Sequence, residues 1–422
     1  MNRKLRIRTA AVLLAAGLTL PISAAVAATS DTGGYPGSWL LDYAGARTLG
    51  LGGAFVAVAD DALGSLWNPA GLQRMNQNQL MFENVHLFED TSVNSFGVAV
   101  PGNWLPSFGL SVVMLHSGDF QRTDELNDPL GTFSETETAY TLTMAKAINP
   151  HFQVGANIKM VQQSLESYSA SGFGTDLGAI VDVGHGLHFG AMAANVGGPS
   201  IQLRSTAESY PTEYRIGGAY DMFRGRGLLV AQLDQGAATG THYHAGTEYW
   251  LLPGIGLQAG IMDNRATGGF SYRFAPQYQL DYGVVDHPLG LSHRVGISYD
   301  FAGFFASSHA DAEVFSPTGD KATTQISLNA RTKGEPDSWK LNLVDKSGTV
   351  VRSFGGPGLP PSHVQWDGKN ESGLPVADGY YSYTLEVKDK VGRVLTGTTR
   401  KVEISTTGPQ GAVPIVTNPT SP

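Results

Sequence analysis

The feature that most constrains the fold is a series of segments in which apolar and polar side chains alternate. HFQVGANIKM has apolar side chains on one face and polar or small ones on the other: Phe152, Val154, Ala156, Ile158 and Met160 against Gln153, Gly155, Asn157 and Lys159. A period of two predicts a β-strand, because successive side chains of a strand point to opposite faces. If Ile158 faces lipid and Asn157 faces the lumen, we expect Asn157→Arg to be much milder than Ile158→Arg.

About fourteen such segments follow one another, and many have about ten residues, the length that a tilted strand needs to cross a bilayer. We expect strands over residues 79–88, 92–100, 107–116, 136–146, 152–161, 174–183, 187–196, 213–222, 228–233, 242–250, 255–262, 269–274, 278–285 and 292–301. Tight turns such as AINP, GHG and LLPG alternate with long polar connections over 117–135, 162–173 and 197–212. This alternation predicts an antiparallel transmembrane β-barrel over 79–301. A large secreted sandwich or propeller is the alternative.

The composition favours a barrel that contacts outer-membrane lipid. Charged residues make up 15% of the chain, against about 25% in typical soluble domains. Glycine accounts for 53 of 422 residues, where about 7% is usual. The net charge of −9 argues against nucleic acid as a partner. The absence of cysteine excludes disulfides and thiolate metal sites.

The first residues have the pattern of an export signal. Four basic side chains, Arg3, Lys4, Arg6 and Arg8, precede an apolar run over 10–20 and an Ala-Val-Ala site at 25–27. This order is typical of a cleaved signal peptide. We therefore expect residues 1–27 to be removed and the mature chain to start near Ala28.

A segment rich in glycine and alanine lies between the signal peptide and the first expected strand. Small residues allow backbone to pack closely, and Asn68 followed by Pro69 can begin a short helix. We interpret residues 28–78 as a segment that folds back into the barrel lumen as a plug. The expected plug or gate residues are Gly45, Arg47, Gly52, Gly53, Asp60, Asp61, Trp67, Asn68, Pro69, Ala70 and Gly71.

The same segment resembles the start of the PorV/PorQ family, which is related to the FadL fatty-acid transporters. The family pattern is G-A-R-x-x-G-x-G-G-A-F-x-A-x-A-D-D followed by W-N-P-A-G-L, and it is matched over residues 45–61 and 67–72. The resemblance implies a fourteen-stranded barrel over about residues 37–301 with an N-terminal segment in its lumen. It also implies a terminal aromatic signal for the barrel-assembly machinery, here Tyr299 and Phe301, although another domain follows.

The sequence changes character after Phe301. We expect a linker over 302–310, a soluble domain over 311–405 and a disordered tail over 406–422. The stretch HVQWDGKNESGLPVADGYYSYTLEV resembles the FlgD-type immunoglobulin-like domain, a β-sandwich. Trp366, with Tyr381 or Tyr383, is the expected core anchor. The predicted fold class is thus all-β throughout.

Catalytic motifs for nucleotide binding, serine hydrolysis or zinc proteolysis are lacking in the sequence. Asp60 and Asp61 can be read as an acid–base pair, but a charged plug is the commoner arrangement. His242 and His244 share a strand face and can bind a metal or simply line the lumen. We expect no enzyme activity, no cofactor and no metal.

Three functions remain open. The chain can carry hydrophobic or small solutes across the outer membrane, as the FadL relationship implies. It can handle exported proteins, as PorV-type barrels do in type IX secretion. It can also anchor a domain that binds a periplasmic or secretion-system protein partner. With an even number of strands, the barrel's chain begins and ends on the same side, which is the periplasmic side in outer-membrane barrels. The C-terminal domain is therefore expected in the periplasm.

Overall fold

The computed structural model describes residues 35–42, 45–87, 90–102, 105–223, 225–236, 238, 240–287, 290–319, 322–390 and 392–406. The expected signal peptide, the mature start near Ala28 and the expected tail from residue 407 onwards lie outside these residues. Among the described residues, no helix is both long and apolar enough to cross a membrane.

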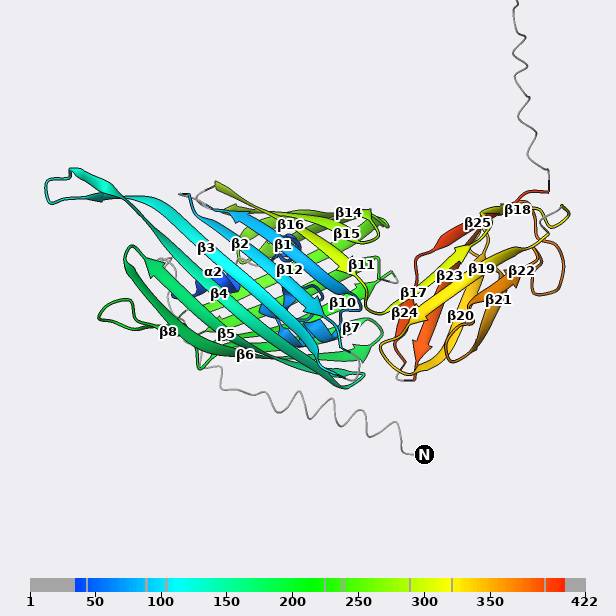
Figure 1. The fold of residues 1–422 in the computed structure, drawn as a ribbon, viewed down its shortest axis with the longest axis horizontal. Helices are drawn as coiled ribbons and strands as arrows, with labels where there is room; N and C mark the ends of the chain where they lie inside the picture. Colours follow the sequence, from blue (N-terminus) through cyan, green and yellow to red (C-terminus); the bar gives the residue numbers. More distant parts are fainter. Residues whose placement is uncertain are drawn as a thin grey trace, which may run out of the picture. The chain divides into compact units, whose positions relative to one another are not determined.

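Fourteen antiparallel strands close into a barrel, as the alternating segments predicted (Figure 1). Their bounds are β1 Asn78–His86, β2 Ser92–Val100, β3 Ser107–Thr123, β4 Pro129–Asn149, β5 Phe152–Leu165, β6 Tyr168–Gly184, β7 Leu187–Val196, β10 Glu213–Met222, β11 Gly227–Gly236, β12 Gly240–Leu252, β13 Ile255–Met262, β14 Arg265–Ala275, β15 Tyr278–His287 and β16 Gly290–Phe301. The barrel closes between β1 and β16, where Asn78 lies opposite Phe301. We call this end of the barrel the terminal end and the opposite end the distal end.

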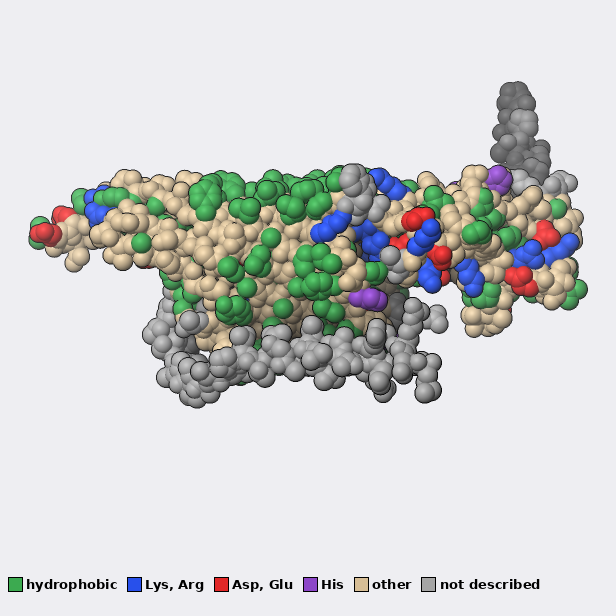
Figure 2. Space-filling model, turned by 90° about the horizontal axis from the view of Figure 1, so that it is seen from below, with side chains coloured by type: hydrophobic (Ala, Val, Ile, Leu, Met, Phe, Trp, Pro, Cys, Tyr) green, Lys and Arg blue, Asp and Glu red, His purple; other side chains and the backbone are tan. Residues whose placement is uncertain are grey.

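The two faces of β5 differ in polarity as expected. On β5, Ile158 points outward and is 59% exposed, whereas Asn157 and Lys159 point inward and are buried. Figure 2 shows hydrophobic side chains gathered on the outer face of the barrel. An apolar exterior around a polar interior is the arrangement required of a barrel in a lipid bilayer.

Aromatic side chains form a stacked row near the terminal end of the barrel. The rings of Phe274, Tyr278, Tyr299 and Phe301 follow one another at centroid distances of 5.5, 4.8 and 5.7 Å. Tyr and Phe at this level suit the interface between lipid headgroups and acyl chains. The role of Tyr299 and Phe301 as an assembly signal stays a prediction.

The prediction of long polar connections is wrong for two of the three stretches, 117–135 and 162–173, because most of their residues are paired in strands. β3 and β4 stay paired to Thr123 and Pro129, and β5 and β6 turn directly between Leu165 and Tyr168. Polar side chains do not interrupt backbone pairing where a strand extends into water. The stretch 197–212 is a true connection and holds only the short strands β8 Ser200–Ile201 and β9 Glu208–Ser209.

The C-terminal domain is built from two sheets. One sheet has the order β17-β19-β22, and the other has β18-β25-β23-β20-β21 with β24 beside β23. The bounds are β17 Phe305–Ala310, β18 Val314–Phe315, β19 Thr324–Arg331, β20 Pro336–Val344, β21 Val350–Pro357, β22 His363–Trp366, β23 Gly379–Asp389, β24 Val394–Thr396 and β25 Arg400–Ile404. Trp366, Tyr381 and Tyr383 are all buried in the core between the sheets, as predicted.

The expected linker over 302–310 is wrong in its second part. Residues 305–310 form β17, which pairs with β19 over its whole length. The small and polar residues of this stretch suggested a linker, but Ala306 and Ala310 point into the core of the domain. Only Ala302, Gly303 and Phe304 lie between the last barrel strand and the first strand of the domain.

The assignment of faces can be tested at Ile158. Replacing it with Arg is expected to destabilise the barrel by about 2–4 kcal/mol, because a charge would face the hydrocarbon layer. Leu126→Arg is the matched control, since Leu126 is 81% exposed in the turn between β3 and β4. Reversible unfolding in lipid vesicles measures both variants. Equal losses would contradict the assigned faces.

Candidate functional site: the plugged lumen

The N-terminal segment folds inside the barrel, as predicted. It contains α2 Ser38–Asp42, α3 Ala46–Gly50, and two short 3-10 helices, η1 Gly64–Leu66 and η2 Pro69–Gln73. Helix α3 packs against β13 to β16, while η2 packs against β3 to β6. Asn68 caps η2, since its side chain accepts a hydrogen bond from the backbone N–H of Ala70 at 3.1 Å. We call residues 45–75 the plug.

The expected plug residues all lie in this segment, and most are buried. The buried ones are Gly45, Gly52, Gly53, Trp67, Asn68, Pro69, Ala70 and Gly71. Arg47 and Asp61 are half-buried, and Asp60 is exposed to the lumen cavity described below. The sequence alone does not show which wall residues these plug residues contact.

The barrel wall meets the plug through glycine. A Cβ atom on inward-facing wall glycines would collide with plug backbone, as at Gly190 with the carbonyl of Val56 and at Gly246 with that of Leu51. The wall glycines in such contact with plug backbone are Gly155, Gly190, Gly246, Gly260 and Gly283, while a Cβ at Gly178 would collide with the side chains of Asn68 and Pro69. Two pairs of them lie directly opposite each other across the strand ladder, Gly155 with Gly178 and Gly246 with Gly260. Direct contact with the plug explains why these wall positions carry glycine.

Wall side chains supply the hydrogen bonds that the plug backbone lacks. The carboxylate of Glu83 accepts from the N–H groups of Gly45 and Ala46 at 2.6 and 2.7 Å. The side-chain oxygen of Gln232 accepts from Phe55 and Val56, both at 2.8 Å. All of these groups are buried, where an unsatisfied N–H is costly by about 1–3 kcal/mol.

Asn157 is a further wall side chain that contacts the plug, which the expected mildness of Asn157→Arg did not allow for. Its side-chain NH₂ donates to the carbonyl of Ser65 at 3.0 Å and to Asp176 at 2.9 Å. Asp176 also accepts from Lys159 at 2.6 Å. Because Asn157 is fully buried against the plug, an Arg at this position has no room, and the expected mildness of Asn157→Arg is wrong.

The charged plug residues form ion pairs across the lumen. Arg47 pairs with Asp60 at 2.7 Å on the plug and with Glu248 of β12, also at 2.7 Å. Asp61 accepts from the N–H of Gly64 at 2.6 Å and so holds the start of η1. Asp60 and Asp61 therefore make different structural contacts, which favours the plug interpretation over an acid–base pair.

Trp67 and the two histidines also have defined partners. The guanidinium of Arg215 lies 4.5 Å from the ring of Trp67. His244 contacts the carbonyl of Gly52 at 2.8 Å, whereas His242 contacts Asp263 at 2.8 Å. The structure thus assigns the two histidines to different contacts. Among the described residues, no group of three or more His, Asp or Glu side chains is placed to hold a metal ion.

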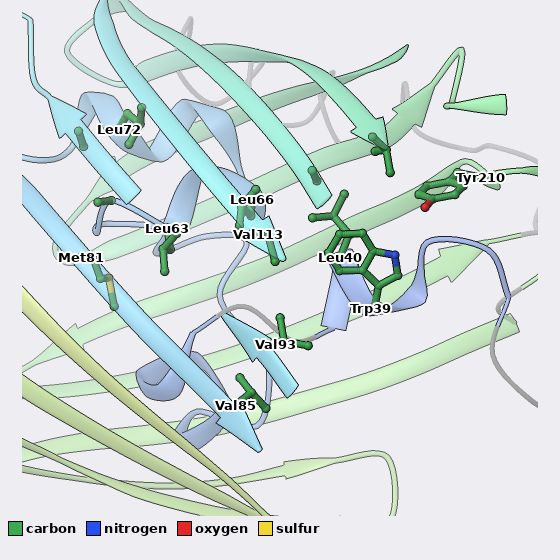
Figure 3. Close-up of a cluster of buried hydrophobic side chains, with 14 of the residues drawn as sticks. Trp39, Leu40, Leu63, Leu66, Leu72, Met81, Val85, Val93, Val113 and Tyr210 are labelled. Carbon is green, nitrogen blue, oxygen red and sulfur yellow. The ribbon is translucent and has the colours of Figure 1, made fainter. Parts of the chain in front are cut away.

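The lumen has an apolar region and a polar region. Inward-facing Val85, Val93 and Val113 pack with plug and α2 side chains in the largest apolar cluster of the lumen (Figure 3). At the terminal end, a cavity of about 290 Å³ lies between plug and wall. Its charged lining residues are Arg47, Asp60, Asp61, Arg74, Asp221, Glu248, Arg273, Asp281 and Asp300, beside His188.

One carboxylate ties α2 to the long distal connection. Glu137 of β4 accepts from the indole N–H of Trp39 at 2.6 Å and from the hydroxyl of Tyr210 at 2.8 Å. The ring of Tyr210 also covers Gly37, where a Cβ would collide with it. These contacts cover the distal side of the apolar cluster, to which Trp39 and Tyr210 belong (Figure 3).

One family model matches part of the chain, and several solved structures are similar to it. Residues 315–390 match the family model of the FlgD Ig-like domain. No curated protein matches the chain. Among solved structures, the toluene transporter TodX of Pseudomonas putida is 13% identical, covering 61% of this chain and 97% of that chain at a TM-score of 0.47.

Two further solved structures are similar. A FadL homologue of Pseudomonas aeruginosa is 11% identical, covering 61% of this chain and 98% of that chain at a TM-score of 0.45. The KdgM porin is 10% identical, covering 53% of this chain and 99% of that chain at a TM-score of 0.32. At such low identities nothing about the solute of this chain follows. The fold and lumen themselves define an outer-membrane-type β-barrel with a folded plug, followed by an immunoglobulin-like domain.

The residues that hold the plug from the wall side were missed by sequence reasoning. Glu83, Gln232 and Glu248 appear in the sequence as ordinary inward-facing polar residues of alternating strands. Their partners lie between 37 and 201 positions away. The recurring inward-facing glycine in many strands was the available signal, because a water-filled lumen does not require small residues.

The role of the wall glycines can be tested at Gly190. Gly190→Ala is expected to destabilise the plugged barrel by about 1–3 kcal/mol, because the new methyl group overlaps the carbonyl of Val56. Gly218→Ala is the matched control on the adjoining strand, where the nearest atom would lie at 3.5 Å. Thermal unfolding in detergent measures the difference. Two variants as stable as the wild type would show that the plug does not press against the wall.

Proposed function

We propose that this chain is an outer-membrane channel for solutes with a hydrophobic body, held closed by its plug. The observation that carries the proposal is the apolar side of the lumen. Inward-facing side chains of a water-filled porin are polar, whereas here Val85, Val93, Val113, Ala139 and Val161 face the plug. Burial of an apolar solute there is favourable by about 0.8 kcal/mol for each CH₂ group.

The plug gives such a channel its gate. Its hydrogen bonds to Glu83 and Gln232 and its ion pair to Glu248 are each local, so they can break one at a time. The polar cavity at the terminal end provides space into which plug side chains can move. An apolar solute entering from the distal side would displace Trp39 and Leu40 from the cluster first.

We also propose that this chain belongs to the PorV/PorQ family. The motif residues of that family build the plug, with Asn68 donating to the carbonyls of Val56 and Ala179. A role in type IX secretion is the second candidate, and it rests on this motif together with the appended immunoglobulin-like domain. Secretion of exported proteins in a deletion strain separates this role from solute uptake.

The gate can be tested at Gln232. Gln232→Leu removes the acceptor of two buried N–H groups and is expected to increase solute uptake severalfold, since each unsatisfied group costs about 1–3 kcal/mol. Gln235→Leu on the same strand is the control, because that side chain is exposed. Uptake of the hydrophobic dye N-phenylnaphthylamine by intact cells is compared with entry of nitrocefin, which is polar. A wild-type protein that admits nitrocefin and not the dye would contradict a hydrophobic solute.

The location of the C-terminal domain is also a proposal. The first barrel strand begins and the last barrel strand ends at the terminal end. The longest hairpin, formed by β3 and β4, extends from the distal end. Short turns face the periplasm in outer-membrane barrels, so we place the immunoglobulin-like domain there. Protease added to intact cells is expected to spare an epitope inserted after Thr406. Loss of the epitope without damage to the outer membrane would place the domain outside the cell.

A further inference from the structure

The immunoglobulin-like domain contacts the end of the plug through one buried lysine. Lys333 lies between β19 and β20 and is only 7% exposed. Its Nζ donates to the carbonyl of Gln73 at 2.5 Å and to that of Met75 at 3.0 Å. These carbonyls belong to the last turn of η2 and the residues just after it, where helix geometry leaves acceptors without partners.

The contact is built rather than incidental. Thr332 donates to the carbonyl of Gly334 at 2.8 Å and so shapes the turn that carries Lys333. A Cβ at Gly334 would collide with the side chains of Asp389 and Arg393, which pair at 2.7 Å. Burial beside Arg393 lowers the pKa of Lys333 to about 7. Even a neutral amine has two N–H groups, enough for both carbonyls.

A second cavity lies beside this contact, since Met75 belongs to both. This cavity of about 310 Å³ is lined by Asn76 and Gln77, which follow the plug, and by Thr396 and Gly397 of the domain. It shares Asp60, Gln79 and Asp300 with the polar lumen cavity. The two cavities therefore adjoin, and the domain forms one wall of the outer one.

A hinge connects the domain to the barrel. Ala302 and Gly303 have φ values of 50° and 93°, and the N–H of Phe304 donates to the carbonyl of Asn76 at 2.7 Å. Residues 302–304 are the covalent connection between the barrel and the immunoglobulin-like domain. A rotation here would withdraw Lys333 from the plug without breaking any strand pairing.

From these contacts we propose that the immunoglobulin-like domain is a lock on the plug: Lys333 holds the end of η2, and displacement of the domain about residues 302–303 opens the terminal end. This proposal rests on the proposed channel function. It differs in assigning control of the gate to a domain outside the barrel. Any ligand or protein that draws the domain away would then increase solute flux.

The test uses the full-length protein in planar lipid bilayers and follows ion conductance. Lys333→Met keeps the length of the side chain but removes the donors, so the open probability is expected to rise about tenfold. Lys340→Met is the matched control, because Lys340 is exposed on β20 of the same domain. Lys333→Arg keeps N–H donors and is expected to behave like the wild type.

A second measurement reports the position of the plug end. The chain has no cysteine, so Met75→Cys, at a buried position, introduces a single thiol. Maleimide labelling of this thiol is expected to be faster when Lys333→Met is added. Wild-type conductance in Lys333→Met would overturn the lock. If Gln232→Leu still raises conductance in the same bilayers, the channel proposal survives that result; if neither variant does, both proposals fail.

Discussion

Direct contact between the plug backbone and the barrel wall is the constraint on which the rest of this structure depends. Where backbone lies against backbone, the wall cannot carry side chains, so glycine recurs at inward positions such as Gly190 and Gly246. Between the glycines, the wall must satisfy the plug's polar groups, which explains buried acceptors such as Glu83 and Gln232. Some of the chain's many glycines are thus a consequence of this packing, and the apolar exterior lowers the share of charged residues.

The same packing divides the lumen. Along one side of the lumen, apolar side chains from strands and plug pack together, and toward the distal end Glu137 bridges α2 to the long connection. Near the terminal end, carboxylates and guanidinium groups surround a cavity. In the proposed channel, an apolar surface and a polar cavity would therefore contact the solute through different residues.

Sequence reasoning found the strands and the plug because both depend on local pattern. Alternation along residues such as Ile158 and Asn157 shows which face meets lipid, and Asn68 with Pro69 shows where η2 begins. It failed where the outcome depends on distant partners. β3 and β4 extend beyond the membrane because their backbones pair, which the polarity of residues 117–135 concealed. The contacts of Glu83, Asn157 and Lys333 join segments far apart in the chain, and one sequence does not show which polar residue meets which.

The density of these contacts limits how the proposed channel can open. Removing the whole plug would break the hydrogen bonds that Glu83, Gln232 and Asn157 make to it, each worth about 0.5–1.5 kcal/mol net, and would expose the apolar cluster to water. The sum approaches the total stability of many domains, about 5–15 kcal/mol. Opening must therefore be local. The plug end at Met75 depends on Lys333, and the segment at Trp39 depends on Glu137. The plug end at Met75 and the α2 segment at Trp39 can move while the glycine-packed centre of the plug stays in place. In the proposed channel, solute would then pass along the plug rather than through the space that the plug occupies.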